Sequence, residues 1–143
     1  MESLSSPTTS LMKAYVFRLE PGSDLYISLK EYLKANNIRA ACILTCVGSL
    51  RKIHLRTATG ASYLKKEDFF EITSLVGCVS TQRNHIHITL ADSEGKTIGG
   101  HLIEEGNIVY TTAEIVLGVF DQLEFQTFQC EKSGWPELKI IQK

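Results

Sequence analysis

Three of the four histidines lie between positions 85 and 101, and their spacing favours a metal site. From Asn84 to Asp92 the sequence NHIHITLAD alternates polar and apolar residues. This alternation is typical of a strand with one buried face and one exposed face. His85 and His87 are two positions apart, so both belong to the exposed face of this strand.

A hairpin is expected to bring His101 to the other two histidines. The loop Ser93-Glu94-Gly95 separates the first strand from a second one over residues 97–103. A glycine at the third position of a three-residue loop accommodates the left-handed conformation that this loop requires. The resulting register pairs Asp92 with Lys96, Ala91 with Thr97, Leu90 with Ile98, Thr89 with Gly99, Ile88 with Gly100, and His87 with His101. A shift of one residue would mix the polar and apolar faces.

Three imidazoles on one face of a hairpin can reach a single ion. Directly opposed side chains lie about 4.5–5.5 Å apart at Cβ, and Gly99 is expected to leave room beside the rings. Neutral imidazole nitrogens suit zinc, with other late divalent metals as alternatives, and a fourth position stays open for water or substrate. The alternative is that His-x-His merely belongs to a polar face. The third histidine across the hairpin favours the metal site, with His85, His87 and His101 as ligands.

One carboxylate, Glu114, is a candidate catalytic group beside these histidines. Residues 108–119 alternate again after the turn Glu104-Glu105-Gly106-Asn107, with the odd positions expected in the core. A turn at Gly106-Asn107 would place Glu114 near His101, whereas a turn at Glu105-Gly106 would move it about 13 Å away. Glu114 could act as a general base, orient a ligand imidazole, pair with a neighbouring chain, or be a solvated surface residue.

The other segments predict a single α/β (α+β) domain over residues 13–143, in which helices flank an antiparallel-rich mixed β-sheet. Residues 1–12 are rich in serine and threonine and are expected to form a disordered tail. A helix is expected from about Asp24 to Ala35, capped by Ser23. Further strands are expected over residues 13–19, 38–47, 51–57, 69–79 and 123–129, with a break at Gly48-Ser49 and a loop or short hairpin over 59–68.

Composition restricts the classes of function. The chain has 143 residues, a formal net charge of −1 and 43% hydrophobic residues, as expected for one globular domain. Its basic residues are scattered, which disfavours direct DNA binding. It has no apolar run of about 18 residues that would span a membrane. The start of the sequence lacks a basic region followed by an apolar run, so a cytoplasmic or nuclear location is expected.

Several single residues are interpreted as structural. The four cysteines show no Cys-x-x-Cys spacing and are expected to be reduced thiols. His54 lies on a half-exposed strand and is expected at the surface rather than as a ligand. Trp135, the only tryptophan, is expected to cover a hydrophobic edge rather than to stack on a ligand.

The order of several motifs resembles the PPC domain, the plants-and-prokaryotes-conserved family. These motifs run from about Lys13 to Cys130 and are PGSDLYISLKEYLKANNIRAACILTCVGSLRKIHLR, FEITSLVGCVS, HIHITLADSEGKTIGGHL and TTAEIVLG. The resemblance implies a compact α/β domain that associates as a homotrimer. Many stand-alone prokaryotic members carry a His-x-His and a later histidine, for which bound zinc is expected. His85, His87 and His101 match that pattern.

The resemblance is to the stand-alone type of the family. In land plants the domain follows an AT-hook with the sequence Arg-Gly-Arg-Pro, which does not occur in this chain. The first hypothesis is therefore a homotrimer with a three-histidine metal site that binds or processes a small molecule. The alternative is a non-enzymatic module for protein interaction and oligomerisation, connected with DNA-associated transcriptional regulation. The sequence does not decide whether the protein is an enzyme.

Overall fold

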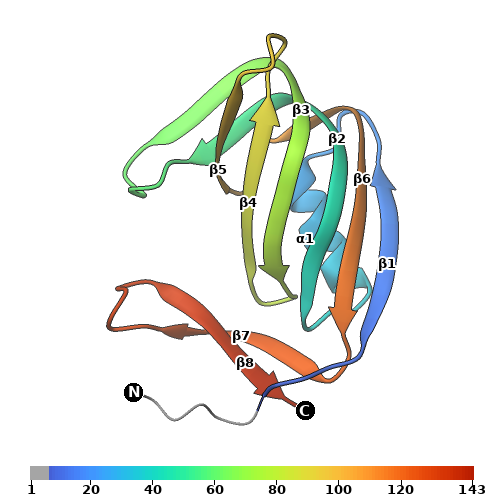
Figure 1. Cartoon of the computed structure of the whole chain (residues 1–143), viewed down its shortest axis with the longest axis vertical. Helices are drawn as coiled ribbons and strands as arrows, with labels where there is room; N and C mark the ends of the chain where they lie inside the picture. Colours follow the sequence, from blue (N-terminus) through green and yellow to red (C-terminus); the bar gives the residue numbers. More distant parts are fainter. Residues whose placement is uncertain (1–6) are drawn as a thin grey trace.

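A six-stranded antiparallel sheet forms the centre of the computed structural model, which describes residues 7–143 (Figure 1). The strands lie in the order β1-β6-β2-β3-β4-β5, and the end of β2 also pairs with β5. Their bounds are β1 Met12–Leu19, β2 Ala41–Arg56, β3 Tyr63–Val79, β4 Asn84–Ala91, β5 Thr97–Leu102 and β6 Ile108–Phe120. All strand pairings in the described part of the chain are antiparallel, so the expected fold class is confirmed without a parallel component.

One helix, α1 (Leu25–Ala35), packs on one face of this sheet (Figure 1). Leu25, Leu29 and Leu33 recur every four residues and are completely buried in the core. The N-cap is Asp24 rather than the expected Ser23, because its carboxylate accepts a hydrogen bond from the backbone N–H of Ile27 at 3.1 Å. Within residues 7–143 α1 is the single α-helix, where the sequence interpretation expected more than one.

Strand β2 is longer than expected. The break predicted at Gly48-Ser49 is wrong, because both residues are buried inside one continuous strand that pairs with β3 and β6. The backbone of Gly48 has φ +154°, and the pairing with β6 shifts register between Gly48 and Leu50. Glycine here marks a bulge rather than a turn. Beyond the bulge, the last two residues of β2, Leu55 and Arg56, pair with β5.

Strand β3 also begins earlier than expected. Residues from Tyr63 onward pair with the second half of β2, so the predicted loop or short hairpin over 59–68 is reduced to the turn that precedes Tyr63. The turn is closed by the backbone N–H of Thr57, which donates to the carbonyl of Ser62. This β2–β3 turn borders the site described below.

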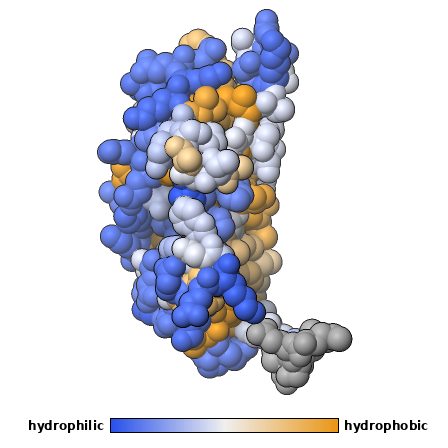
Figure 2. Space-filling view, turned by 90° about the vertical axis from the view of Figure 1, so that its left-hand side faces the viewer, coloured by the Kyte–Doolittle hydropathy of each residue, from blue (hydrophilic) through white to orange (hydrophobic). Residues whose placement is uncertain are grey.

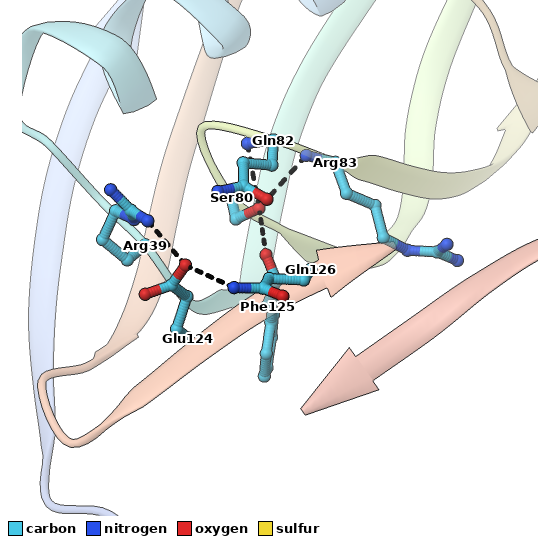
Figure 3. A network of polar contacts seen from close by, with 7 residues as sticks. All are labelled: Arg39, Ser80, Gln82, Arg83, Glu124, Phe125 and Gln126. Atoms are coloured by element: carbon cyan, nitrogen blue, oxygen red, sulfur yellow. Dashed lines mark hydrogen bonds and ion pairs between the residues drawn. The ribbon is translucent and has the colours of Figure 1, made fainter. Parts of the chain in front are cut away.

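A second sheet consists of the hairpin β7 (Leu123–Gln129) and β8 (Pro136–Gln142). Strand β8 was not expected from the sequence. A polar network fixes the hairpin below the main sheet (Figure 3). Arg39 donates to Glu124 at 2.5 Å, and the hydroxyl of Ser80 donates to the carbonyl of Phe125 at 3.1 Å. The turn after β7 places Trp135 near the start of β4.

The described part of the expected N-terminal tail contacts the rest of the chain. Strand β1 begins at Met12, and the amide of Gln142 donates to the carbonyl of Thr9 at 3.1 Å. The hydroxyl of Ser10 donates to the side chain of Gln122 at 3.0 Å. Residues 1–6, the rest of the predicted disordered segment, lie outside the described residues.

Two other expectations can be compared with the structure. Cys42, Cys46, Cys78 and Cys130 are free thiols, and burial raises the pKa of Cys46 to about 12. This thiol is therefore inert at neutral pH.

None of the helices among residues 7–143 is long and apolar enough to cross a membrane.

Candidate metal centre

The hairpin β4–β5 has the register that the sequence predicts. All five pairs from Ala91 with Thr97 to His87 with His101 are confirmed. The ring centroids of His85 and His87 lie 4.9 Å apart, and those of His101 lie 5.3 and 5.5 Å from them. One nitrogen from each ring lies within 4.8 Å of the other two. The hairpin therefore brings the three predicted ligands together.

The chemistry and spacing of these donors fit a transition metal. The Nε2 atoms of His85 and His87 are 3.3 Å apart. Two imidazoles that share one tetrahedral zinc, with bonds of about 2.0–2.1 Å, lie roughly 3.3 Å apart. A ring nitrogen of His101 lies within 4.8 Å of a nitrogen of each of the other two rings, so a rotation of its side chain would complete the set. All three side chains are at least partly accessible, so an ion can reach them.

Two glycines allow β5 to approach its neighbours closely. A Cβ at Gly99 would lie 2.6 Å from the carbonyl oxygen of Ile88, and one at Gly100 would lie 2.7 Å from that of Arg56. Either contact would push β5 away from β4 or β2. Gly99 lines the cleft beside the histidines, as the expectation that it leaves room there requires, and both glycines in addition keep His101 close to His87.

Burial keeps two of the imidazoles neutral. Desolvation, with a further contribution from the guanidinium of Arg56, lowers the pKa of His101 to about 4. Desolvation and the neighbouring His87 lower the pKa of His85. At neutral pH both rings are consequently neutral, and each has one unprotonated nitrogen, as metal binding requires.

One contact must change when an ion binds. A guanidinium nitrogen of Arg83 lies 3.0 Å from Nδ1 of His85. Because arginine can only donate, Nδ1 accepts and the ring proton sits on Nε2, from which it points at His87. Coordination through Nε2 requires that proton to move, and hence Arg83 to release the ring. Arg83 thus orients His85 while no ion is bound.

The lowered pKa values predict a loss of stability in mild acid. As the pH falls from about 6.5 to 4, the unfolded chain protonates at His101 while the folded chain does not, so the free energy of unfolding decreases. The His101→Gln variant without metal should show a flatter dependence between pH 6.5 and 5. Urea unfolding at several pH values in the presence of a chelator measures this. A His54→Gln variant is the control, and equal slopes in all three proteins would contradict the prediction.

The histidines lie in an open cleft of about 930 Å³. Its walls come from the β2–β3 turn, the first half of β4, the second half of β5, and the β7–β8 turn. Figure 2 views the molecule from the side to which both turns project, and this face is largely hydrophilic with small apolar patches. Trp135 of the β7–β8 turn lies against Gly60 of the β2–β3 turn, since a Cβ added to Gly60 would be 3.3 Å from the indole ring. The two turns are therefore in contact. Charged residues in the cleft wall are Arg56, Arg83 and Glu137.

The expected position of Glu114 depended on a strand pairing that is wrong. Strand β6 pairs with β1 and β2 and not with β5, and Glu114 lies opposite Arg18 and Val47. Strands β2 and β3 separate it from the histidine hairpin, and three strand spacings of about 4.8 Å amount to roughly 14 Å. Glu114 is exposed and does not line the cleft. Within one chain it is therefore not placed as a base or as a partner of the ligand imidazoles.

Two further expectations concern His54 and Trp135. His54 is outside the cluster, as expected, and its Nδ1 lies 3.2 Å from the carbonyl of Glu105. Trp135 was expected to cover a hydrophobic edge, but it is half exposed and lies against the guanidinium of Arg56, 5.2 Å from the ring centroid. The sequence interpretation missed Arg56 and Arg83. The alternation Arg83-x-His85-x-His87 was a usable signal, since it places Arg83 on the histidine face.

Comparison with known proteins identifies the class. The family model of the Plants and Prokaryotes Conserved (PCC) domain matches residues 6–121, and the chain belongs to this family, the one that its motifs resemble. A Bifunctional protein GlmU from Synechococcus sp. (strain JA-3-3Ab) is 39% identical over 134 residues. This alignment covers 94% of the chain and 21% of the relative, so the chain spans about a fifth of the length of that protein.

Solved structures share the whole fold. A hypothetical protein from Salmonella cholerae-suis (Salmonella enterica) superposes with a TM-score of 0.91 at 34% identity, covering 94% of this chain and 97% of the other. The metal-containing protein AF0104 from Archaeoglobus fulgidus superposes with a TM-score of 0.76 at 27% identity, covering 94% and 99%. The family and the fold are thereby established.

Proposed function

We propose that this protein is a metal-binding member of the PCC family that binds or processes a small molecule in the histidine cleft. His85, His87 and His101 are the proposed ligands, and zinc is the proposed ion. The observation that carries the proposal is the convergence of three imidazole nitrogens within 4.8 Å on one rigid hairpin. A structural relative described as metal-containing supports it.

The chemistry of such a centre follows from its open position. A zinc ion held by three imidazoles polarises a substrate oxygen or lowers the pKa of a bound water. The chain itself supplies a cleft large enough for a small molecule, and Arg83 orients His85 there before an ion binds. With Glu114 remote from the cleft, no carboxylate that the sequence suggested as a base stands beside the ligands. The geometry therefore supports the binding of a small molecule more strongly than it supports catalysis.

Association into a homotrimer is part of the proposal. Strand residues that face away from the core expose apolar side chains on three strands of the main sheet, namely Val16, Val47 and Val76, which are 69%, 56% and 53% exposed. Apolar surface of this kind on one sheet supports a subunit interface. Val76 lies directly opposite His87, so a second chain on this face would adjoin the metal site. Sedimentation equilibrium would distinguish one 16.0 kDa chain from three.

The same apolar face favours the second candidate function. A pure interaction module would use it to hold other proteins, and its histidines would have no metal-dependent role. That function predicts partner binding that survives the loss of His87. The metal-centre function predicts that loss of His87 abolishes ligand binding in the cleft while the exposed apolar face is unchanged.

Elemental analysis of untagged protein tests the metal centre. We expect about one zinc or similar ion per native chain after reconstitution and dialysis, and at least tenfold less in His87→Ala and in His101→Ala, because a ligand is lost in each. His54→Ala, a histidine outside the cluster, is the matched control and should keep the ion. Circular dichroism checks that each variant is folded. A native chain without stoichiometric metal, or folded variants that retain it, would overturn the proposal.

A further inference from the structure

Arg56 occupies a position beside the histidines that the metal proposal does not use. It is the last residue of β2 and lies directly opposite His101 on β5. Directly opposed residues on neighbouring strands project to the same face of a sheet. Arg56 also lines the histidine cleft, and its charge contributes to the lowered pKa of His101. A guanidinium group thus stands at the wall of the metal site.

The guanidinium of Arg56 has no anionic partner among residues 7–143. It makes no ion pair within 4.0 Å and no hydrogen bond there, and its Nε is buried without an acceptor. The Nε atoms of Arg39 and Arg83 are also buried without an acceptor, but Glu124 pairs with Arg39 at 2.5 Å, and Arg83 donates through its terminal nitrogens, whereas Arg56 has neither kind of partner. Buried donors without acceptors are uncommon because they are costly. The pattern indicates that the acceptor for Arg56 comes from outside the chain.

Trp135 holds this group in place. The guanidinium lies 5.2 Å from the ring centroid, a distance typical of a cation–π contact, which orients the planar group without satisfying its N–H donors. The terminal N–H groups of the guanidinium, which are neither buried nor hydrogen-bonded within the described chain, remain available to a ligand. The indole itself is fixed through its contact with the β2–β3 turn, as the close approach to Gly60 shows.

The charge of the cleft selects an anion. Its wall carries Arg56 and Arg83 but one carboxylate among the described residues, Glu137. Arg83 has no carboxylate within ion-pair distance in the described chain, and it donates instead to the carbonyl of Pro136 at 3.1 Å. Any divalent ion at the histidines adds positive charge. Carboxylates and phosphates match the planar fork of arginine with two parallel hydrogen bonds.

We propose that the cleft binds a small molecule through a carboxylate or phosphate group, which Arg56 holds beside the three histidines. This inference rests on the proposed function for the identity of the site and adds the chemical class of its ligand. It requires the anionic group to lie between the guanidinium and the imidazoles, where it can also fill the open position of an ion.

Trp135 provides a direct measurement because it is the only tryptophan in the chain. We would titrate the full-length protein with inorganic phosphate and, separately, with succinate, and follow indole fluorescence with calorimetry as a second readout. Each titration is made with zinc-loaded protein freed of excess zinc and with chelator-treated protein. We expect saturable binding of at least one anion, tighter in the zinc-loaded form. The tighter-binding probe identifies the phosphate or the carboxylate as the preferred group.

Arg56→Gln should weaken this binding at least tenfold while zinc content is retained. Arg51→Gln is the matched control, because Arg51 is an exposed arginine on the same strand that does not line the cleft. Arg56→Lys, which keeps the charge but loses the fork, should be intermediate. No saturable binding, or equal binding by the native and Arg56→Gln proteins, would overturn the inference.

The two proposals fail in different ways. If the native protein takes up no metal, the metal centre fails, and anion binding that depends on Arg56 in chelator-treated protein would still support the present inference. If zinc binds stoichiometrically but neither anion binds, the metal centre stands and the ligand class is wrong.

Discussion

Gly48→Ala should destabilise the fold by about 3–5 kcal/mol, the larger of two stability effects expected from single substitutions. A Cβ at this position would lie 2.0 Å from the carbonyl oxygen of Thr112 and 2.8 Å from Cα of Ala113. Both are backbone atoms of β6, so the clash is relieved only if β2 and β6 separate. Overpacking of this kind typically costs about 1–3 kcal/mol or more, and a side chain on a residue with a φ of +154° adds of order 1–3 kcal/mol.

A second glycine separates these two contributions. Gly22 has φ +88°, and a Cβ added there would meet nothing within 4 Å, so Gly22→Ala incurs the conformational cost alone. Urea unfolding of the native, Gly22→Ala and Gly48→Ala proteins should show a small shift for Gly22 and a large shift, or failure to fold, for Gly48. Equal midpoints for the two variants would show that the clash at β6 is relieved without cost.

Asn107→Ala should cost about 3 kcal/mol of unfolding free energy. Asn107 belongs to the segment that connects β5 to β6, and its side chain is completely buried. Its side-chain oxygen accepts from the backbone N–H of His54 at 2.9 Å, and its amide donates to the carbonyls of His54 and Ile103, each at 3.1 Å. Alanine leaves three backbone groups without their partner in the interior, at about 1 kcal/mol or more each.

The loss of these hydrogen bonds should also loosen the wall of the cleft. Asn107 joins the β5–β6 connection to His54 on β2, and His54 is two residues before Arg56. We therefore expect amide hydrogen exchange at Leu55 and Arg56 to accelerate together with the loss of stability. Asn36→Ala is the control, since Asn36 is exposed and its side chain donates a single hydrogen bond to the carbonyl of Tyr32 at the end of α1. Its cost should stay below about 1 kcal/mol. A similar loss in both variants would contradict the buried role of Asn107.

The local sequence pattern was sufficient to predict the histidine hairpin. The loop Ser93-Glu94-Gly95 and the strict alternation on both sides determine one register, because any shift by one residue would expose the apolar face. The helix was equally accessible, since its leucines recur every four residues. In both cases the interactions that determine the structure lie within about twenty residues of one another.

Long-range pairing was not accessible in the same way. The alternation in residues 108–119 identifies β6 as a strand but not its neighbours, and a connection through Glu105 and Gly106 suggested a simple hairpin with β5. Both residues do adopt the positive φ that a tight hairpin turn requires, but β6 does not pair with β5 and lies between β1 and β2. That position of β6 removes Glu114 from the site. The strand break predicted at Gly48-Ser49 is wrong for a related reason. Burial between two neighbouring strands outweighs the preference of these residues for a turn.

All three histidines belong to a single hairpin closed by a three-residue loop. Contacts this close in sequence form early in folding, because little chain entropy is lost in closing the loop. The ligand set can therefore assemble before β2 and β6 enclose the core. An ion that binds this early hairpin as well as the native state stabilises the native fold by less than its affinity implies, since linkage counts only the difference. For the proposed metal centre, we therefore expect metal affinity and global stability to be separable properties.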